Sequence, residues 1–266
     1  MLAITSTFWI PKRGSSVEEY EDAVWVGPDG SGSGEANCQS LRVAVADGAS
    51  ESLLAGRWAR RLVKVFGSER TTQTRSAFVV AYQSAVGGWD DEVAQYTKDR
   101  EERSAPIQWY EEPGLAKGAH ATLIAAEFRD GRGGRAPTWS ACAVGDSCLF
   151  QVRNELLYAS FPLTEASAFT YQPPLLPSRG IEDAVLRRNV SRKAGDWERG
   201  DSFYIVTDAL AAWFLSVIES GGRPWEPLRD LDTLDAELDF AEWVEKQRSI
   251  GQMANDDTTL VRIDMC

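Results

Sequence analysis

The stretch VAVADGAS, residues 43–50, ends a run of small apolar residues on an aspartate that a glycine follows at once. The apolar run predicts a short buried strand, because no polar residue interrupts it. Asp47 then lies where the sheet passes into a loop, and Gly48 allows a tight turn and a close approach of its carbonyl to a ligand. The same stretch also fits a strand followed by a helix-capping turn, with Asp47 or Ser50 as the cap of a helix in residues 51–66.

The composition favours a soluble enzyme-sized domain with an acidic surface. The chain has 266 residues, of which 43% are hydrophobic, and we expect residues 1–266 to form a single domain. Its net charge of −12 comes from 40 acidic and 28 basic residues. This charge argues against a nucleic-acid partner, since phosphate backbones bind basic surfaces. A surplus of carboxylates is better suited to divalent cations, although most of them are expected to be solvated surface groups.

The cysteine spacing and the apolar segments indicate where in the cell the protein is expected. The four cysteines, at 38, 142, 148 and 266, have no C-x-x-C spacing, so we expect reduced thiols in a reducing compartment. Residues 1–14 lack the basic start and long apolar centre of a signal peptide. The most apolar window, 203–218, contains Asp208 and is too short to span a membrane. We therefore expect a cytoplasmic monomer without a membrane partner.

Hydrophobic spacing predicts strands first and then two helices. Strands are expected at 3–10 and 22–27, and a Gly/Ser-rich turn at 27–40 leads into the strand that ends at Asp47. Apolar residues recur every four positions from Leu54 to Phe66, and again from Phe78 to Tyr96, which indicates two helices that pack on a core.

The second half of the chain alternates at strand spacing and then returns to helices. Strands are expected at 120–128, 137–146, 147–154 and 155–161. Residues 166–180 are proline-rich and predict an irregular surface flap. A strand, an aspartate and a helix follow in 201–222, then a helix in 239–252 and a last strand in 255–266. No internal repeat interrupts this order, so the pattern favours a single α+β domain.

Acidic residues recur at the ends of the expected strands. Asp208 ends one apolar strand, and Asp256 and Asp257 precede another, while Glu21 and Asp22 precede a third. If these strand ends lie side by side, the carboxylates converge and repel one another unless a divalent cation compensates their charge. Oxygen ligands of this kind favour Mg²⁺ or Mn²⁺ over zinc.

Six short motifs, taken together and in order, resemble the metal-dependent protein phosphatase 2C family, and most of all its compact bacterial members. The motifs are EYEDA (19–23), VADGAS (45–50), GAHAT (118–122), AVGDS (143–147), IVTDAL (205–210) and NDDTTLV (255–261). The resemblance covers Trp9 to Asp264. It implies a four-layer α-β-β-α sandwich, in which helices flank two antiparallel β-sheets that carry a two-metal site at one edge.

The resemblance also implies a role for each acidic residue. Asp47 would bridge two Mn²⁺ or Mg²⁺ ions, the carbonyl of Gly48 would bind one of them, and Asp208 and Asp256 would complete the shell of the other. Catalysis would run through a water that these ions activate, since two cations about 3.5–4 Å apart acidify a shared water and clamp phosphoryl oxygens.

Three further acidic positions match the family pattern less centrally. Glu21 and Asp22 match a pair that mainly holds metal-bound waters. Asp146 matches a position that serves a weaker third metal. A second aspartate often supports that site, but Ala212 stands at its position, so the third site should be weak or absent.

Other departures from the family pattern affect the residues that bind the phosphate group and donate a proton. The family usually has glycine where this chain has Ala209, and some members have a proton-donating histidine where it has Ala49. A phosphate-binding arginine usually stands at the position of Val17, and Lys12 or Arg13 is the expected substitute. His120 opens an expected core strand, so we expect a structural role for it.

These observations predict a metal-dependent phosphatase that acts on phosphoserine or phosphothreonine in proteins. Two alternatives remain open: a catalytically impaired relative that uses the fold to bind a partner, and a hydrolase of small phosphoesters. Retention of the principal ligand positions argues against the first alternative.

Overall fold

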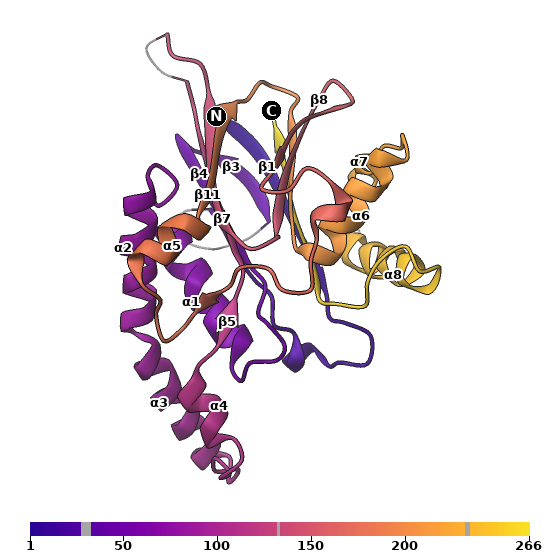
Figure 1. The fold of residues 1–266 in the computed structure, drawn as a ribbon. Helices are drawn as coiled ribbons and strands as arrows, with labels where there is room; N and C mark the ends of the chain where they lie inside the picture. The colour runs from indigo at the N-terminus through magenta and orange to yellow at the C-terminus, as the bar shows by residue number, and fades with distance from the viewer. Residues whose placement is uncertain (28–32, 132–133, 232–234) are drawn as a thin grey trace.

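The computed structural model shows two antiparallel β-sheets packed face to face, with helices on both outer faces (Figure 1). It describes residues 1–27, 33–131, 134–231 and 235–266. Within these ranges the larger sheet has the order β3 (Gly34–Asn37), β1 (Leu2–Ile10), β13 (Thr258–Met265), β12 (Ser202–Val206), β8 (Cys148–Arg153) and β9 (Leu156–Phe161). The smaller has the order β11 (Ser191–Asp196), β7 (Thr138–Val144), β6 (Leu123–Arg129), β4 (Ser40–Ala46) and β2 (Ala23–Val26).

The helices belong to two outer layers. One group is on the side of the smaller sheet: α1 (Ala55–Ser68), α2 (Arg75–Gly87) and α5 (Asp183–Asn189), with α3 (Trp89–Glu102) and α4 (Glu112–Lys117) extending beyond the sheet. The other lies beside the larger sheet: α6 (Asp208–Glu219), α7 (Trp225–Arg229) and α8 (Ala236–Ser249). Two short strands, β5 (His120–Ala121) and β10 (Leu176–Pro177), pair with each other, and 3-10 turns cover Val17–Glu19 and Ala166–Ala168.

Three hydrophobic clusters fill the spaces between these layers. The first joins α1 and α2 to the smaller sheet, the second lies between the two sheets, and the third joins α6 and α8 to the larger sheet. Three interfaces between consecutive layers define four layers. The predicted α+β fold, with two antiparallel sheets between helices, is therefore confirmed.

The alternation within the opening stretch explains why its strand lacks polar residues. Val43 and Val45 belong to the cluster between the sheets, whereas Ala44 and Ala46 belong to the cluster under α1. Successive side chains of a strand point to opposite faces, and here both faces are covered. The small alanines leave room for α1 to pack closely on β4, as the four residues are at most 1% exposed.

The helix expected from Phe78 to Tyr96 is in fact two helices. Gly88 ends α2 and precedes α3, with backbone angles (φ −106°, ψ 11°) outside the helical region. A side chain at this position would overlap the Arg61 guanidinium, since its Cβ would stand 1.6 Å from a guanidinium nitrogen. The glycine therefore leaves room for the Arg61 guanidinium at the junction of the two helices.

Two further expectations differ from the structure, and one strand, β11, was not expected. The turn expected at 27–40 contains β3, which forms because its backbone pairs with the edge of β1, while residues 28–32 lie outside the described residues. The flap expected at 166–180 is anchored at its end: Leu176 is fully buried, and its carbonyl accepts a hydrogen bond from Trp58 Nε1 at 2.7 Å. The edge strand β11 is exposed along most of its length and so lacks the alternation that sequence patterns detect.

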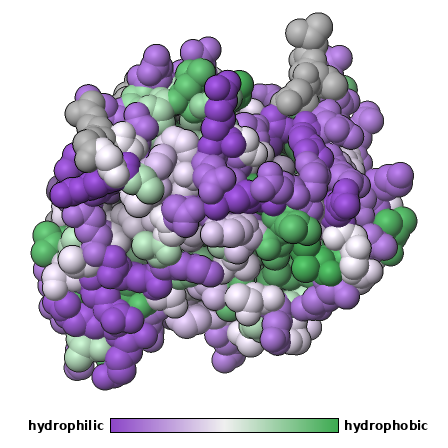
Figure 2. Space-filling view, turned by 90° about the horizontal axis from the view of Figure 1, so that it is seen from above, coloured by the Kyte–Doolittle hydropathy of each residue, from purple (hydrophilic) through white to green (hydrophobic). Residues whose placement is uncertain are grey.

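Among the described residues, no helix has the length and apolarity needed to cross a bilayer. The end of the molecule that carries both termini is mainly hydrophilic, with a few compact hydrophobic patches (Figure 2). All four cysteines are free thiols, as expected from their spacing.

Candidate metal centre

Strand register brings the predicted acidic residues to one edge of the sandwich. In the smaller sheet Ala23 pairs with Ala46, so Asp22 before one strand lies beside Asp47 after the other. In the larger sheet Val206 pairs with both Leu260 and Cys148. Asp208, Asp256 and Asp146 adjoin these three residues in the chain, so they gather at one end of the larger sheet.

Asp47 is held by backbone bonds rather than by a helix cap. Its carbonyl accepts the Thr122 N–H at 2.8 Å, and the Ala49 N–H donates to the His120 carbonyl at 3.0 Å. These bonds flank Gly48, whose own carbonyl faces away from that neighbouring segment. The alternative reading, in which Asp47 or Ser50 caps the next helix, is wrong: α1 begins after Leu54, which is in the left-handed region and makes no side-chain cap.

Gly48 lies in a space that has no room for a side chain. A Cβ there would stand 2.8 Å from the backbone carbonyl carbon of Ala55 and 2.8 Å from the carbonyl oxygen of Glu21. The glycine therefore lets β4, the start of α1 and the Glu21 backbone meet at one point. This contact fixes the position of Asp47 relative to Glu21.

Thr259 connects the two sheets beneath the acidic residues. Its hydroxyl donates to Asp22 Oδ2 at 2.5 Å, and the Tyr20 hydroxyl lies 2.5 Å from the same Thr259 oxygen. The Thr259 N–H donates to Thr207 Oγ1 at 3.0 Å, immediately before Asp208. Sequence motifs did not identify these hydroxyl residues as part of the site. Their only sequence signal is their position next to the acidic residues.

The adjacent residues Asp256 and Asp257 have different hydrogen-bond partners. Asp257 is buried, and its carboxylate accepts the backbone N–H groups of Lys12 at 2.8 Å and Glu21 at 2.7 Å. It therefore ties the loop after β1 to the start of β13. The Asp256 carboxylate accepts one backbone N–H, that of Asp257, at 2.9 Å, and is left facing the other acidic groups.

Mutual repulsion shows that these carboxylates share one space. Burial raises the pKa of Asp47 well above its ordinary value, and four neighbouring charges raise it further: Asp22, Asp208, Asp256 and Asp146. Burial, followed by the charges of Asp146 and Asp256, raises the pKa of Asp208 to about 7. Burial and then Asp256 raise the pKa of Asp146 to about 6. These carboxylates therefore lie within electrostatic reach of one another, while their role as metal ligands stays a prediction.

The donor atoms at this edge suit a hard divalent cation. Asp22 Oδ1 and Asp146 Oδ1 are buried and have no hydrogen-bond partner, an arrangement that leaves buried charge uncompensated. Carboxylate and carbonyl oxygens match Mg²⁺ and Mn²⁺. Within the described ranges, however, no three acidic, cysteine or histidine side chains are assembled into a ready metal-binding group. Ligation therefore requires these side chains to turn toward a common cation.

The two residues predicted to bind phosphate take different positions. Lys12 Nζ donates to Ser50 Oγ at 2.7 Å and lies 3.6 Å from Glu21 Oε2, beside the acidic edge. Arg13 instead pairs with Glu245 on α8, with 2.7 Å between the closest charged atoms. The structure therefore brings Lys12, but not Arg13, to the candidate site, and the phosphate-binding role of both remains a prediction.

Comparison with known proteins agrees with this geometry at the level of the fold. No protein-family model and no curated protein matches the sequence. Among solved structures, the serine/threonine phosphatase PstP/Ppp of Mycobacterium tuberculosis is 13% identical, with 100% of this chain and 99% of that chain covered and a TM-score of 0.57. The S. agalactiae serine/threonine phosphatase is 14% identical, with 99% and 100% covered and a TM-score of 0.56.

One similar structure contains metal. The catalytic domain of the serine/threonine protein phosphatase PstP, in complex with two manganese ions, is 14% identical to this chain; 98% of each chain is covered, and the TM-score is 0.52. Likeness at this identity establishes the arrangement of helices and strands. The chain therefore has the fold of the protein phosphatase 2C family.

Proposed function

We propose that this protein is a metal-dependent phosphatase that hydrolyses phosphoserine or phosphothreonine in proteins. The observation that carries the proposal is the convergence of five aspartates at one sandwich edge, where burial and mutual repulsion raise the pKa of Asp47 far above its usual value. Such a group of buried carboxylates needs a compensating charge. The fold shared with serine/threonine phosphatases, one of them in complex with manganese, supports the same reading.

Each acidic residue has a role in this proposal. Asp47, Asp208 and Asp256 hold two Mn²⁺ or Mg²⁺ ions together with the Gly48 carbonyl. Asp22 and Glu21 stand at the periphery and orient water. When bound, the two ions supply Lewis acidity toward water and the phosphoryl oxygens.

Other residues fix this arrangement or contact the substrate. Thr259 holds the Asp22 carboxylate through its hydroxyl, and Asp257 holds the loop that carries Lys12. The Lys12 ammonium, which lies beside Glu21 and Ser50, is placed to attract an anionic phosphoryl group. Asp146 is buried beside Asp208 and belongs to a weaker, third metal site.

Hydrolysis of an aryl phosphate, measured with Mn²⁺ and with EDTA, tests the proposal. We expect turnover with Mn²⁺ and its loss in EDTA. Asp208→Asn keeps the shape of the side chain but replaces a charged ligand with a neutral amide, so turnover should fall at least about a hundredfold, which is ~2.7 kcal/mol in the barrier. Asp230→Asn, an exposed aspartate beyond α7, is the matched control and should retain activity.

The outcomes separate the enzyme from its alternatives. Metal-dependent turnover excludes a relative that only binds a partner. A folded protein without turnover at any Mn²⁺ concentration contradicts the proposal. Comparison of phosphoserine peptides with small phosphoesters then distinguishes a protein phosphatase from a hydrolase of small molecules.

A further inference from the structure

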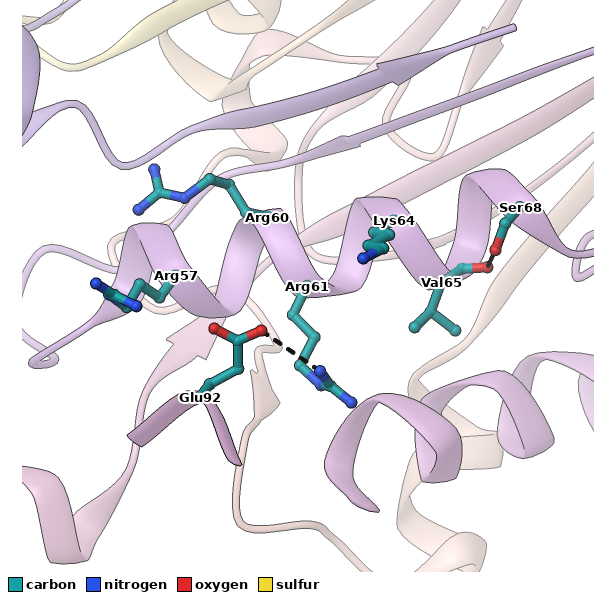
Figure 3. A pocket seen from close by; sticks show the side chains of 7 residues that line it. All are labelled: Arg57, Arg60, Arg61, Lys64, Val65, Ser68 and Glu92. Atoms are coloured by element: carbon teal, nitrogen blue, oxygen red, sulfur yellow. Dashed lines mark hydrogen bonds and ion pairs between the residues drawn. The ribbon is translucent and has the colours of Figure 1, made fainter. Parts of the chain in front are cut away.

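The outer face of α1 carries a dense group of cations in an otherwise acidic chain. Arg57, Arg60, Arg61 and Lys64 fall within two turns of the helix and line an open depression of about 620 Å³ (Figure 3). The opposite face of α1, which includes Trp58, Leu62 and Phe66, is buried against the smaller sheet. The net charge of the whole chain is −12, so this local surplus is opposite in sign to the charge of the molecule.

Two of these cations serve the fold. Arg57 forms an ion pair with Asp99 of α3 at 2.9 Å. Arg61 donates to the Ala85 carbonyl at 2.6 Å and lies 3.5 Å from Glu92, as the dashed line in Figure 3 shows. Both therefore connect α1 to the neighbouring helices, and their positive charge is partly compensated.

The other two cations have no such task. Arg60 and Lys64 are exposed and make no hydrogen bond or ion pair with any residue that the structure describes. Figure 3 shows the Arg60 side chain directed away from Arg61 and Glu92, on the other side of the helix. Two unpaired cations one helical turn apart present charge that the fold itself does not use.

This surface is continuous with the candidate metal centre. A second groove, of about 400 Å³, shares Arg57 and Arg60 with the first and extends to Lys12, Glu21 and Ser50. Glu18 and Glu19 also line it, so its charge is mixed and the surplus of cations lies along α1. A Cβ placed on Gly56 would stand 3.2 Å from Glu21 Cα and 3.5 Å from Arg60 Nη1, so Gly56 lies between the Glu21 backbone and the guanidinium. We call the joined surface from Lys12 to Ser68 the basic track.

The dimensions of the basic track match a short peptide. The helical part from Arg57 to Ser68 is roughly 16 Å long at 1.5 Å per residue. An extended chain covers about 3.3 Å per residue, so about five residues fit along it. A segment of this length would extend from Arg57, on the side of the acidic edge, to Ser68.

We infer that the basic track binds an acidic segment of the phosphoprotein substrate, within about five residues of the phosphorylated side chain. This inference rests on the proposed function, because it places the phosphoryl group at the acidic edge. Carboxylates of the substrate meet Arg60 and Lys64 along α1, whereas the chain as a whole, at a net charge of −12, repels them. The track thus selects acidic sequences and sets their direction. A nucleic acid fits less well, because its phosphates continue beyond the few cations available.

Peptide kinetics test the inference. Two phosphoserine peptides of equal length are compared, one with glutamates and one with glutamines flanking the phosphoserine. We expect wild-type protein to show a lower KM for the acidic peptide. Arg60→Gln combined with Lys64→Gln removes two exposed charges and should reduce this preference by about three- to tenfold, the range expected for two surface ion pairs.

The control variant removes the same amount of charge elsewhere. Arg188 and Arg199 are exposed and line neither groove. Arg188→Gln combined with Arg199→Gln should keep the wild-type preference. If both double variants lose the preference equally, net charge rather than the basic track is responsible, and the inference fails. It also fails if wild-type protein does not distinguish the two peptides.

A binding measurement separates this inference from the proposed function. Anisotropy of the labelled acidic phosphopeptide in EDTA reports affinity without turnover. We expect the Arg60→Gln/Lys64→Gln variant to bind about three- to tenfold more weakly, and high salt to abolish the difference. Absence of Mn²⁺-dependent aryl phosphate hydrolysis would refute the phosphatase and leave this readout intact. A labelled oligonucleotide that binds the track more tightly than the acidic peptide would overturn the inference.

Discussion

Gly48→Ala is expected to destabilise the protein because the site edge has no room for one methyl group. The new Cβ would stand 2.8 Å from backbone atoms of both Ala55 and Glu21, and ordinary contact begins at 3.4 Å. Each gap must therefore open by about 0.6 Å, and neither backbone atom can rotate away. Forcing extra volume into a packed position costs about 1–3 kcal/mol. For a chain of this size, that lowers Tm by roughly 2–12 °C.

Thermal unfolding in EDTA measures this effect on the fold alone. Gly87→Ala is the matched control, since Gly87 is the last residue of α2 and a Cβ there meets nothing within 4 Å. Alanine is the better helix former, so this variant should be unchanged or more stable by up to about 1 kcal/mol. If Gly48→Ala unfolds at the wild-type temperature, the close contact between β4, α1 and Glu21 does not constrain Asp47 as argued.

Three other predictions concern the charges at the same edge. Because the pKa of Asp208 is raised to about 7 and that of Asp146 to about 6, the folded protein in EDTA binds more protons than the unfolded chain between about pH 4 and 7. Its Tm should therefore fall from about pH 5 to about pH 8, and a rise would contradict the raised values. Asp146→Ala should leave the affinity of the two main Mn²⁺ sites nearly unchanged in a calorimetric titration; loss of either site would place Asp146 among their ligands. Thr259→Val leaves the buried Asp22 carboxylate without its 2.5 Å donor and should cost about 1–3 kcal/mol in urea unfolding, whereas wild-type stability would show that Tyr20 replaces it.

Sequence patterns predicted the layers and the acidic edge because both depend on local signals. The valines and alanines of residues 43–46 alternate between two buried faces, and a strand covered on both sides contains only such residues. The aspartates adjoin apolar runs, so their placement follows as soon as the strands pair antiparallel in register. Pairing between strands distant in the chain was thus needed only to bring the strand ends, with their aspartates, together.

Features that depend on residues distant in the chain could not be predicted from local sequence patterns. The Arg61 guanidinium packs against Gly88 between α2 and α3, and no residue near 88 in the sequence indicates that contact. Lys12 and Arg13 are neighbours with the same charge, yet one lies at the candidate site and the other pairs with Glu245. The position of Arg13 depends on α8 and that of Lys12 on Ser50 and Glu21, and both α8 and Ser50 are distant from them in the chain.

The basic residues of α1 also recur at helical spacing, but only the apolar residues were used to predict this helix. The stripe from Leu54 to Phe66 predicts the buried face of α1 correctly, and the basic residues occupy the opposite face at helical spacing. Their spacing could have revealed a basic face. The identity of the unpaired cations, Arg60 and Lys64, could not have been predicted, because pairing of Arg57 and Arg61 requires α3.

Calorimetric titration of Mn²⁺ into chelator-stripped protein tests the central claim most directly. If Asp47, Asp208 and Asp256 form a two-metal centre, the folded wild-type protein should bind two Mn²⁺ ions tightly, and its Tm should rise with ligand concentration. Asp47→Asn should lose both strong sites, since Asp47 is the proposed bridge. A folded wild-type protein that binds no Mn²⁺ would contradict the account.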